Sequence, residues 1–176
     1  WDFLSIALAV FGVDRFLPRR DTADGWTRVI LLEVELLEPE PWIAEADRLA
    51  AALRFLSGDI WHLRFRSGGQ AVPIFPRQQT DRDCTCLFSG GLDSLIDGID
   101  ATAQGRRPIF VSQLAFEDSA RQIAYANALG GGDWHQQWSH KVVFSGKKET
   151  STRARSMAFY GLAVLATSLL TVNRPD

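Results

Sequence analysis

Residues 86–94 read CLFSGGLDS, in which a short apolar strand meets two glycines and then a helix. The pattern predicts the strand over residues 83–88 and the helix from residue 92 to about residue 103. A strand that passes through Ser-Gly-Gly into a helix leaves several backbone N–H groups free at the positive end of the helix dipole. We therefore expect this loop to bind an anion such as a phosphate group.

The side chains of the loop suit that chemistry. Gly90 and Gly91 lack a Cβ, so the backbone can approach a phosphate closely, and Ser89 and Ser94 add hydroxyl donors. Asp93 would repel a bare polyanion, which favours a Mg²⁺ ion between its carboxylate and the phosphate oxygens. The alternative is a tight strand–helix turn with a capping aspartate, which would need neither the serines nor a second glycine.

Two other phosphate-binding motifs are absent from the sequence. No stretch matches G-x-x-x-x-G-K-[ST], and none matches G-x-G-x-x-G. The kinase and dinucleotide-binding classes therefore lose their main support.

Strands and helices alternate after the loop. The pattern predicts strands at residues 107–112 and within 134–144, and helices at 119–129 and 151–170. This order is typical of an α/β fold with a parallel sheet and helices on both faces. Ligands of such sheets bind at the carboxyl ends of the strands, where the loop lies and where Ser112 ends the next strand.

Residues 1–69 predict a small α+β N-terminal unit with a packing or docking role. It comprises a buried helix over 3–16, a strand over 28–37 with one wet side, a helix over 41–55 closed by Gly58, and a strand over 60–66. Glycines, prolines and polar residues at 70–82 predict a linker, and 83–176 form the nucleotide-binding domain. Because the sequence begins at tryptophan and stops after an apolar helix, we expect a C-terminally incomplete piece of a longer protein.

The charge balance restricts the partners. The chain has 19 basic and 21 acidic residues, a net charge of -2, so we expect no direct nucleic-acid binding. No apolar run approaches the roughly 20 residues of a membrane span and no secretion signal is visible, which favours a cytoplasmic location without membrane contact. The early arginines Arg15, Arg19 and Arg20 are interpreted as solvated surface.

Cys84 and Cys86 lie on one face of the strand that precedes the loop. A zinc site needs four ligands, and the three histidines are scattered along the chain. Two buried thiols in a reducing cytosol are therefore favoured over a ligand pair.

Residues 89–94, SGGLDS, resemble the S-G-G-x-D-S loop of the PP-loop ATP pyrophosphatases, whose fold is adenine nucleotide alpha hydrolase-like. The longer stretches CLFSGGLDSL at 86–95 and TSTRARS at 150–156 are most similar to QueC-like proteins, the 7-cyano-7-deazaguanine synthases of queuosine biosynthesis. The branch resembled is the one found in anti-phage defence, such as the QatC component of Qat systems. Its N-terminal extension resembles residues 1–69, so the likeness covers nearly the whole chain.

The resemblance implies a ligase that uses ATP and Mg²⁺ to activate a carboxylate. The acid becomes an acyl-adenylate with release of pyrophosphate, and a nitrogen nucleophile then displaces AMP. In the queuosine pathway the acid is 7-carboxy-7-deazaguanine and the product is a nitrile formed through an amide. For the defence branch the resemblance implies a deazapurine–protein conjugate, with partners from the defence operon or a second copy of the chain.

The resemblance also implies the site residues. Arg155 would stabilise charge at the α-phosphate and act with Asp93 in catalysis, whereas Arg153 is left open between ATP contact and surface. Ser112 would lie near the adenine, and Lys147 and Lys148 either close over the phosphates or belong to a solvated loop. The expected ATP-binding residues are Phe88, Ser89, Gly90, Gly91, Leu92, Asp93, Ser94, Ser112, Arg153 and Arg155.

Two departures leave the substrate open. Ser156 follows Arg155 where the queuosine-pathway proteins have asparagine, and no cysteine follows Cys86, so zinc is not supported within this chain. One alternative is another PP-loop amidating enzyme or sulfur transferase, although a tRNA thiolase would need catalytic cysteines near the site. The other alternative is a non-catalytic ATP-binding module of a defence complex.

Overall fold

The computed structural model describes residues 1–70, 78–114, 118–140, 143, 145–146, 148–168 and 170–172. Contacts divide the chain into two compact units, and each is described by itself. The first unit holds residues 1–73 and 142–161, and the second holds residues 74–141 and 162–176. The sequence prediction gave residues 142–161 to the nucleotide-binding domain, whereas these contacts group them with the first unit. Residues 71–77 of the predicted linker lie outside the described residues.

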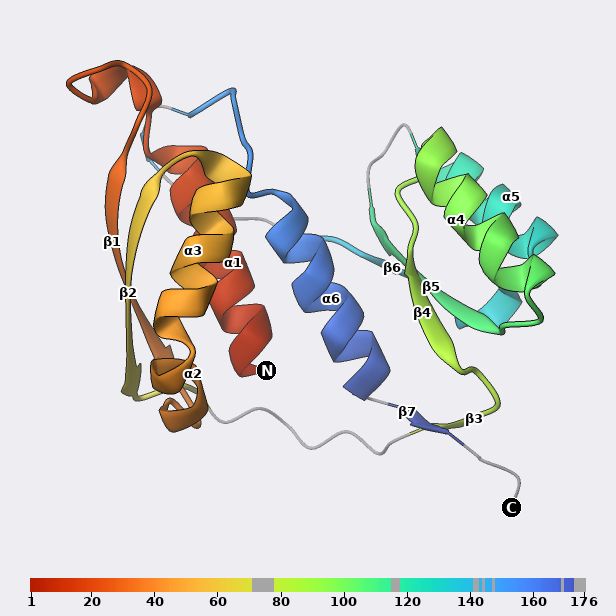
Figure 1. The fold of residues 1–176 in the computed structure, drawn as a ribbon. Coiled ribbons are helices and arrows are strands. Elements are labelled where there is room, and N and C mark those ends of the chain that lie inside the picture. Colours follow the sequence, from red (N-terminus) through yellow and green to blue (C-terminus); the bar gives the residue numbers. More distant parts are fainter. Residues whose placement is uncertain are drawn as a thin grey trace. The chain divides into compact units, whose positions relative to one another are not determined.

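The first unit begins with a helix, α1 (Asp2–Phe16), and continues through β1 (Val29–Leu36), α2 (Glu40–Ala44), α3 (Ala46–Ser57) and β2 (Ile60–Ser67) (Figure 1). α1 ends at the extended residue Leu17, because the following proline disfavours a helical residue before it. Gly58 ends α3 with a φ of 76°, the left-handed conformation that glycine adopts at low cost. The single helix expected over 41–55 is instead two helices separated at Glu45.

β1 and β2 pair in parallel, with Val29 opposite Ile60 and Leu36 opposite Ser67. The expected α+β class is therefore wrong for this unit: α2 and α3 carry the chain back across the strands, so both run in the same direction, as in an α/β unit. The alternation predicted for β1 is confirmed, because its residues are exposed and buried in turn.

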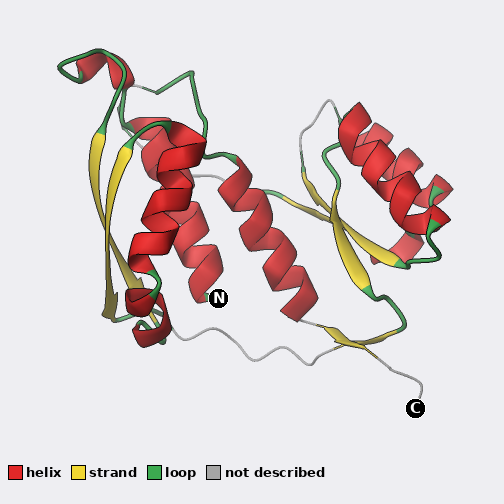
Figure 2. Cartoon of the chain, viewed as in Figure 1, coloured by secondary structure: helices red, strands yellow, loops and turns green. Residues whose placement is uncertain are grey.

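The core of the first unit lies between the sheet and its helices, and α1 and α3 cover one face of the strand pair (Figures 1 and 2). Its largest fully buried apolar side chains are Ile6, Val10, Leu36 and Leu53. The late segment also contributes, since Ala154 and Met157 are buried in the same cluster.

The second unit contains a three-stranded parallel sheet in the order β4-β5-β6. Its elements follow one another as β4 (Cys84–Leu87), α4 (Leu92–Ala103), β5 (Pro108–Gln113), α5 (Ser119–Ala128) and β6 (His135–Trp138). The α/β class and the parallel sheet are confirmed here. α4 and α5 lie on the same face of the sheet, where Phe88, Phe110 and Ala126 form the core.

A third helix, α6 (Ser156–Ser168), belongs to this unit from residue 162 onward. The hydroxyl groups of Thr85 and Thr167 lie 2.8 Å apart. Cys86, the next residue of β4, packs into the core under α4 and α5, so Thr85 points to the opposite face. The end of α6 therefore contacts the face of β4 opposite to α4 and α5.

Two short strands were not foreseen. β3 (Gln78–Thr80) falls in the predicted linker and pairs in parallel with β7 (Leu170–Val172), which begins at the last residue of the predicted helix over 151–170. α6 also begins at Ser156 rather than at 151. In the described part of the chain, no helix is long and apolar enough to cross a membrane.

Candidate anion-binding loop

The loop at 88–94 leaves the sheet where β4 ends and enters α4 directly. Phe88 is still tied to the sheet, since its N–H donates to the carbonyl oxygen of Val111 at 2.8 Å. Gly90 then has a φ of 84°, a conformation that residues with a Cβ rarely adopt. Gly91 is the N-cap of α4 in an extended conformation. The predicted strand–glycine–helix transition is therefore confirmed.

The two serine hydroxyls meet across the loop. Ser89 Oγ and Ser94 Oγ lie 3.1 Å apart, and Ser94 Oγ donates to the carbonyl oxygen of Gly91 at 3.0 Å. The N–H of Gly91 donates to Ser89 Oγ at 3.3 Å. The hydroxyls therefore flank the start of the helix.

Most of the backbone donors in the loop are free. Five N–H groups have no hydrogen-bond partner among the described residues, those of Ser89, Gly90, Leu92, Asp93 and Ser94. These residues fill the stretch 89–94 except for Gly91, and the stretch lies at the positive end of the α4 dipole. Such a row of donors attracts an anion.

The first two carbonyls of the loop are engaged by side chains. Ser112 Oγ donates to the carbonyl oxygen of Phe88, and Gln122 Nε2 donates to that of Ser89 at 2.9 Å. Gln122 Nε2 also reaches the carbonyl oxygen of Gln113 at 3.2 Å. Because these oxygens are engaged within the protein, the loop directs donors rather than acceptors outward.

Ser112 lies at the carboxyl end of β5, as expected, but it is fully buried. The Ser112 hydroxyl donates its hydrogen to the carbonyl oxygen of Phe88. His135 Nε2 lies 2.8 Å from Ser112 Oγ and therefore donates to that hydroxyl oxygen. Burial lowers the pKa of His135, which agrees with a neutral ring in this role. Ser112 thus fastens the loop to the neighbouring strand.

Asp93 is exposed in the first turn of α4. The described residues contain no group of three or more His, Cys, Asp or Glu side chains that could hold a metal ion. A single carboxylate still fits Mg²⁺, because this ion is commonly bound through one or two carboxylates together with substrate phosphates. Asp93 could therefore hold Mg²⁺ only together with the oxygens of a bound phosphate and water.

The two cysteines are poorly suited to catalysis. Burial raises the pKa of Cys86 to about 11 and also raises that of Cys84. Both thiols are therefore protonated at neutral pH, which weakens them as nucleophiles and as metal ligands.

The two candidate arginines belong to the first unit. The guanidinium of Arg153 lies over the Trp26 ring at 4.1 Å, and its backbone N–H donates to Asp14 Oδ2 at 2.7 Å. Arg155 is exposed, just before α6. Lys148 is exposed, and Lys147 lies outside the described residues. The contacts group these two arginines in one unit and the six-residue loop in the other.

A buried charge cluster in the first unit was missed from the sequence. Arg28 Nη2 lies 2.6 Å from Asp14 Oδ1 and 2.5 Å from Asp59 Oδ2, and Arg19 Nη1 lies 2.7 Å from Asp59 Oδ1. The expectation that Arg19 is solvated is wrong, because the fold surrounds it with acceptors. Asp14 Oδ2 also accepts the backbone N–H of Ala154, so the cluster fixes the segment before Arg155.

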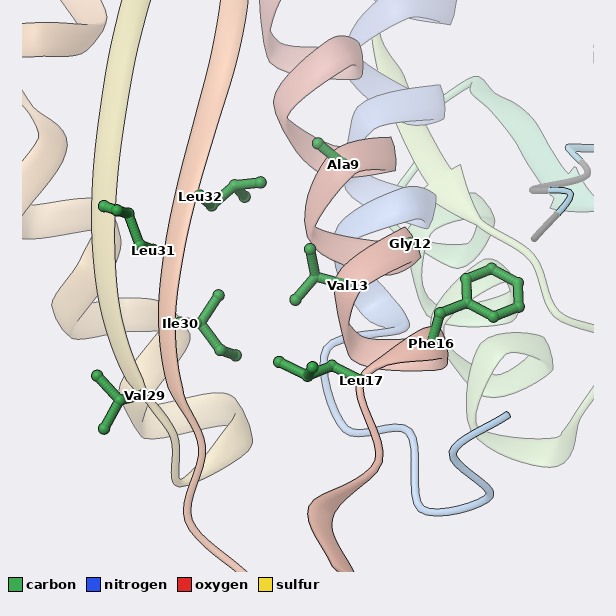
Figure 3. Close-up of a pocket in the computed structure, with 9 residues that line it drawn as sticks. All are labelled: Ala9, Gly12, Val13, Phe16, Leu17, Val29, Ile30, Leu31 and Leu32. Atoms are coloured by element: carbon green, nitrogen blue, oxygen red, sulfur yellow. The ribbon is translucent and has the colours of Figure 1, made fainter. Parts of the chain in front are cut away.

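The first unit also has an apolar groove of about 640 Å³ between α1 and β1. Figure 3 shows Val13 and Leu17 facing Ile30 and Leu32 across it. Its lining is aliphatic and aromatic and carries no charged side chain, so it offers nothing to neutralise a nucleotide phosphate.

Sequence reasoning found the loop but missed the polar side chains behind it. Gln122 and His135 belong to no motif, and no signal in the sequence marks them. Comparison of the chain with protein-family models, with curated proteins and with solved structures finds no match.

Proposed function

We propose that this chain carries the ATP-binding part of a QueC-like PP-loop ligase that adenylates a carboxylate, and that it acts in the cytoplasm in anti-phage defence. The single observation that carries the proposal is the set of five N–H groups at 89–94 without a partner among the described residues, beside two carbonyl oxygens that accept hydrogen bonds from side chains. The loop's resemblance to S-G-G-x-D-S supplies the reaction class.

The proposed reaction has two steps. A carboxylate oxygen attacks the α-phosphorus of ATP, and the bond from that phosphorus to the oxygen bridging to the β-phosphorus breaks. The free N–H groups, with Ser89 and Ser94, hold the departing pyrophosphate and stabilise its charge. A nitrogen nucleophile then attacks the acyl carbon and loses a proton, and AMP leaves to give an amide or a deazapurine–protein conjugate. A nitrile would need a second ATP, which adenylates the amide oxygen so that it departs with AMP.

Bound Mg²⁺ would neutralise charge on the phosphate oxygens, and Asp93 would hold it. Arg155 would serve the α-phosphate, where negative charge develops as phosphorus becomes five-coordinate. Arg153 is the weaker candidate for this role, because its guanidinium already lies on Trp26.

The test is mass spectrometry of the protein with ATP, Mg²⁺ and 7-carboxy-7-deazaguanine. AMP and pyrophosphate, together with an amide, a nitrile or a modified polypeptide, would support the proposal. ADP and phosphate would contradict it. Arg155→Ala should lower kcat about 100-fold or more, whereas Arg153→Ala should change it much less.

A non-catalytic ATP-binding module is the second candidate. The contact of Arg153 with Trp26 favours it, because that guanidinium is engaged away from any phosphate. Titration calorimetry that shows ATP binding, with no AMP produced beside carboxylate acids and candidate partner proteins, would select this candidate.

A further inference from the structure

We infer that Gln122 is a positioning residue that holds the loop at 89–94 in the conformation that presents its N–H groups to an anion. The expected effect on anion binding rests on the proposed function, whereas the contacts of Gln122 are independent of any ligand. Gln122 lies in α5, outside the loop motif, and its side chain is buried, with a residue exposure of 1%.

All the hydrogen-bonding groups of this amide are used. Its two hydrogens go to the carbonyl oxygens of Ser89 and Gln113, at 2.9 and 3.2 Å. Its oxygen accepts Gln137 Nε2 at 2.9 Å. One side chain therefore joins the loop, the end of β5 and β6, and leaving any of these groups unpaired when buried would be unfavourable.

The contact with Ser89 fixes the direction of the next donor. In a trans peptide the C=O and the N–H point in opposite directions, so the Ser89 carbonyl and the Gly90 N–H are coupled. Holding the carbonyl against Gln122 turns the Gly90 N–H away from α5. If the carbonyl were released, this peptide could rotate and place an acceptor where the anion binds.

Gly90 shows how closely the two residues fit. A Cβ at this position would lie 2.9 Å from Gln122 Cγ, closer than real Cβ atoms approach. Two features therefore require glycine at position 90: its positive φ and the nearness of Gln122. Ser112 does the same for the preceding peptide, since it holds the Phe88 carbonyl.

The experiment compares Gln122→Met, which keeps the length of the side chain but removes its donors, with wild type. Pyrophosphate binding is measured by titration calorimetry, and the order parameters of the Gly90 and Gly91 amides are measured by NMR without ligand. We expect at least a tenfold weaker affinity and lower order parameters. Gln137→Met is the matched control: it removes the bonds to Gln122 and Ser119 of α5 but none to the loop, and its affinity should stay within about twofold of wild type.

Wild-type affinity and order in Gln122→Met would overturn the inference, as would equal losses in both variants, which would indicate general loosening of α5. If wild type itself does not bind pyrophosphate, the proposed function fails, while the amide order parameters still test the role of Gln122. Should Gln122→Met not fold, Gln122→Asn replaces it, since its shorter amide cannot reach Ser89 and Gln113 together.

Discussion

At the scale of single residues, the loop depends on side chains that donate hydrogen bonds to its carbonyl oxygens. Ser112 and Gln122 engage the oxygens of Phe88 and Ser89, and His135 supports Ser112 from β6. The backbone N–H groups that remain without a partner among the described residues are the donors on which the proposed anion binding depends. The chemistry of the motif therefore rests partly on residues far from it in sequence.

Gly90→Ala should destabilise the protein more than Gly105→Ala. Both glycines have positive φ, 84° and 75°, so each alanine incurs a left-handed strain of about 1–2 kcal/mol. Only at Gly90 would the new Cβ also meet Gln122, because nothing lies within 4 Å of Gly105. Urea denaturation measures both values, and equal losses would show that the contact with Gln122 is unimportant.

His135 should make the protein less stable in mild acid. Burial lowers its pKa in the folded state, so the unfolded chain takes up a proton more readily than the folded one. The stability that the neutral His135 ring contributes is fully present above the ordinary histidine pKa of about 6.5 and is lost as the pH falls below that value. The free energy of unfolding of wild type should therefore fall more between pH 7.5 and 5.5 than that of His135→Gln. Parallel curves would exclude this role.

At the scale of elements, the segment before α6 is shaped by α1. Asp14 accepts the backbone N–H groups of Arg153 and Ala154, just before α6 begins at Ser156. Asp14 is itself held by Arg28, which also binds Asp59. The charge cluster thus connects α1, the strand pair and the late segment of the first unit.

Arg28→Leu should therefore be strongly destabilising. It removes the shared cation from two buried carboxylates, a loss of about 3–5 kcal/mol for a broken buried pair. Arg66→Leu is the exposed comparison, since Arg66 pairs with Glu33 and Glu35 on the wet face and should contribute about 1 kcal/mol or less. Chemical denaturation measures the free energy of unfolding of both variants. Similar losses would contradict a larger stabilising role for Arg28 than for Arg66.

The sequence predicted elements with a clear period well and isolated contacts poorly. The helix over 92–103 and the cap at Gly58 were predicted because periodicity and glycine chemistry act locally. β3 and β7 were missed because three residues carry no recognisable period. Arg19 was interpreted as a surface residue, and Gln122 was not singled out, because the acceptors that they contact come from other elements.

At the scale of the whole molecule, the chain passes from the first unit to the second, returns at residue 142, and leaves again at residue 162. The first unit therefore needs its late segment, since Ala154 and Met157 complete its core. The residues of α6 up to Gly161 belong to the first unit, and those from Leu162 onward belong to the second. No single cut of the chain separates the two units.

A fragment of residues 1–70 should accordingly fold poorly. It would keep Asp14 but lose both backbone donors to it, and its core would lack two buried side chains. Circular dichroism during heating should show no cooperative transition, and a separate peptide of residues 145–161 should restore one. A sharp transition of the fragment alone would show that the late segment is dispensable.

The protonated thiols of β4 have a practical consequence for labelling. Because Cys86 has a pKa of about 11 and that of Cys84 is also raised, neither should react quickly with maleimide at neutral pH. Leu92 is 71% exposed at the start of α4, so Leu92→Cys would give one fast-reacting position within the loop itself. A fluorophore attached there would test the proposed nucleotide binding by a change in its emission on addition of ATP, without removal of the native cysteines.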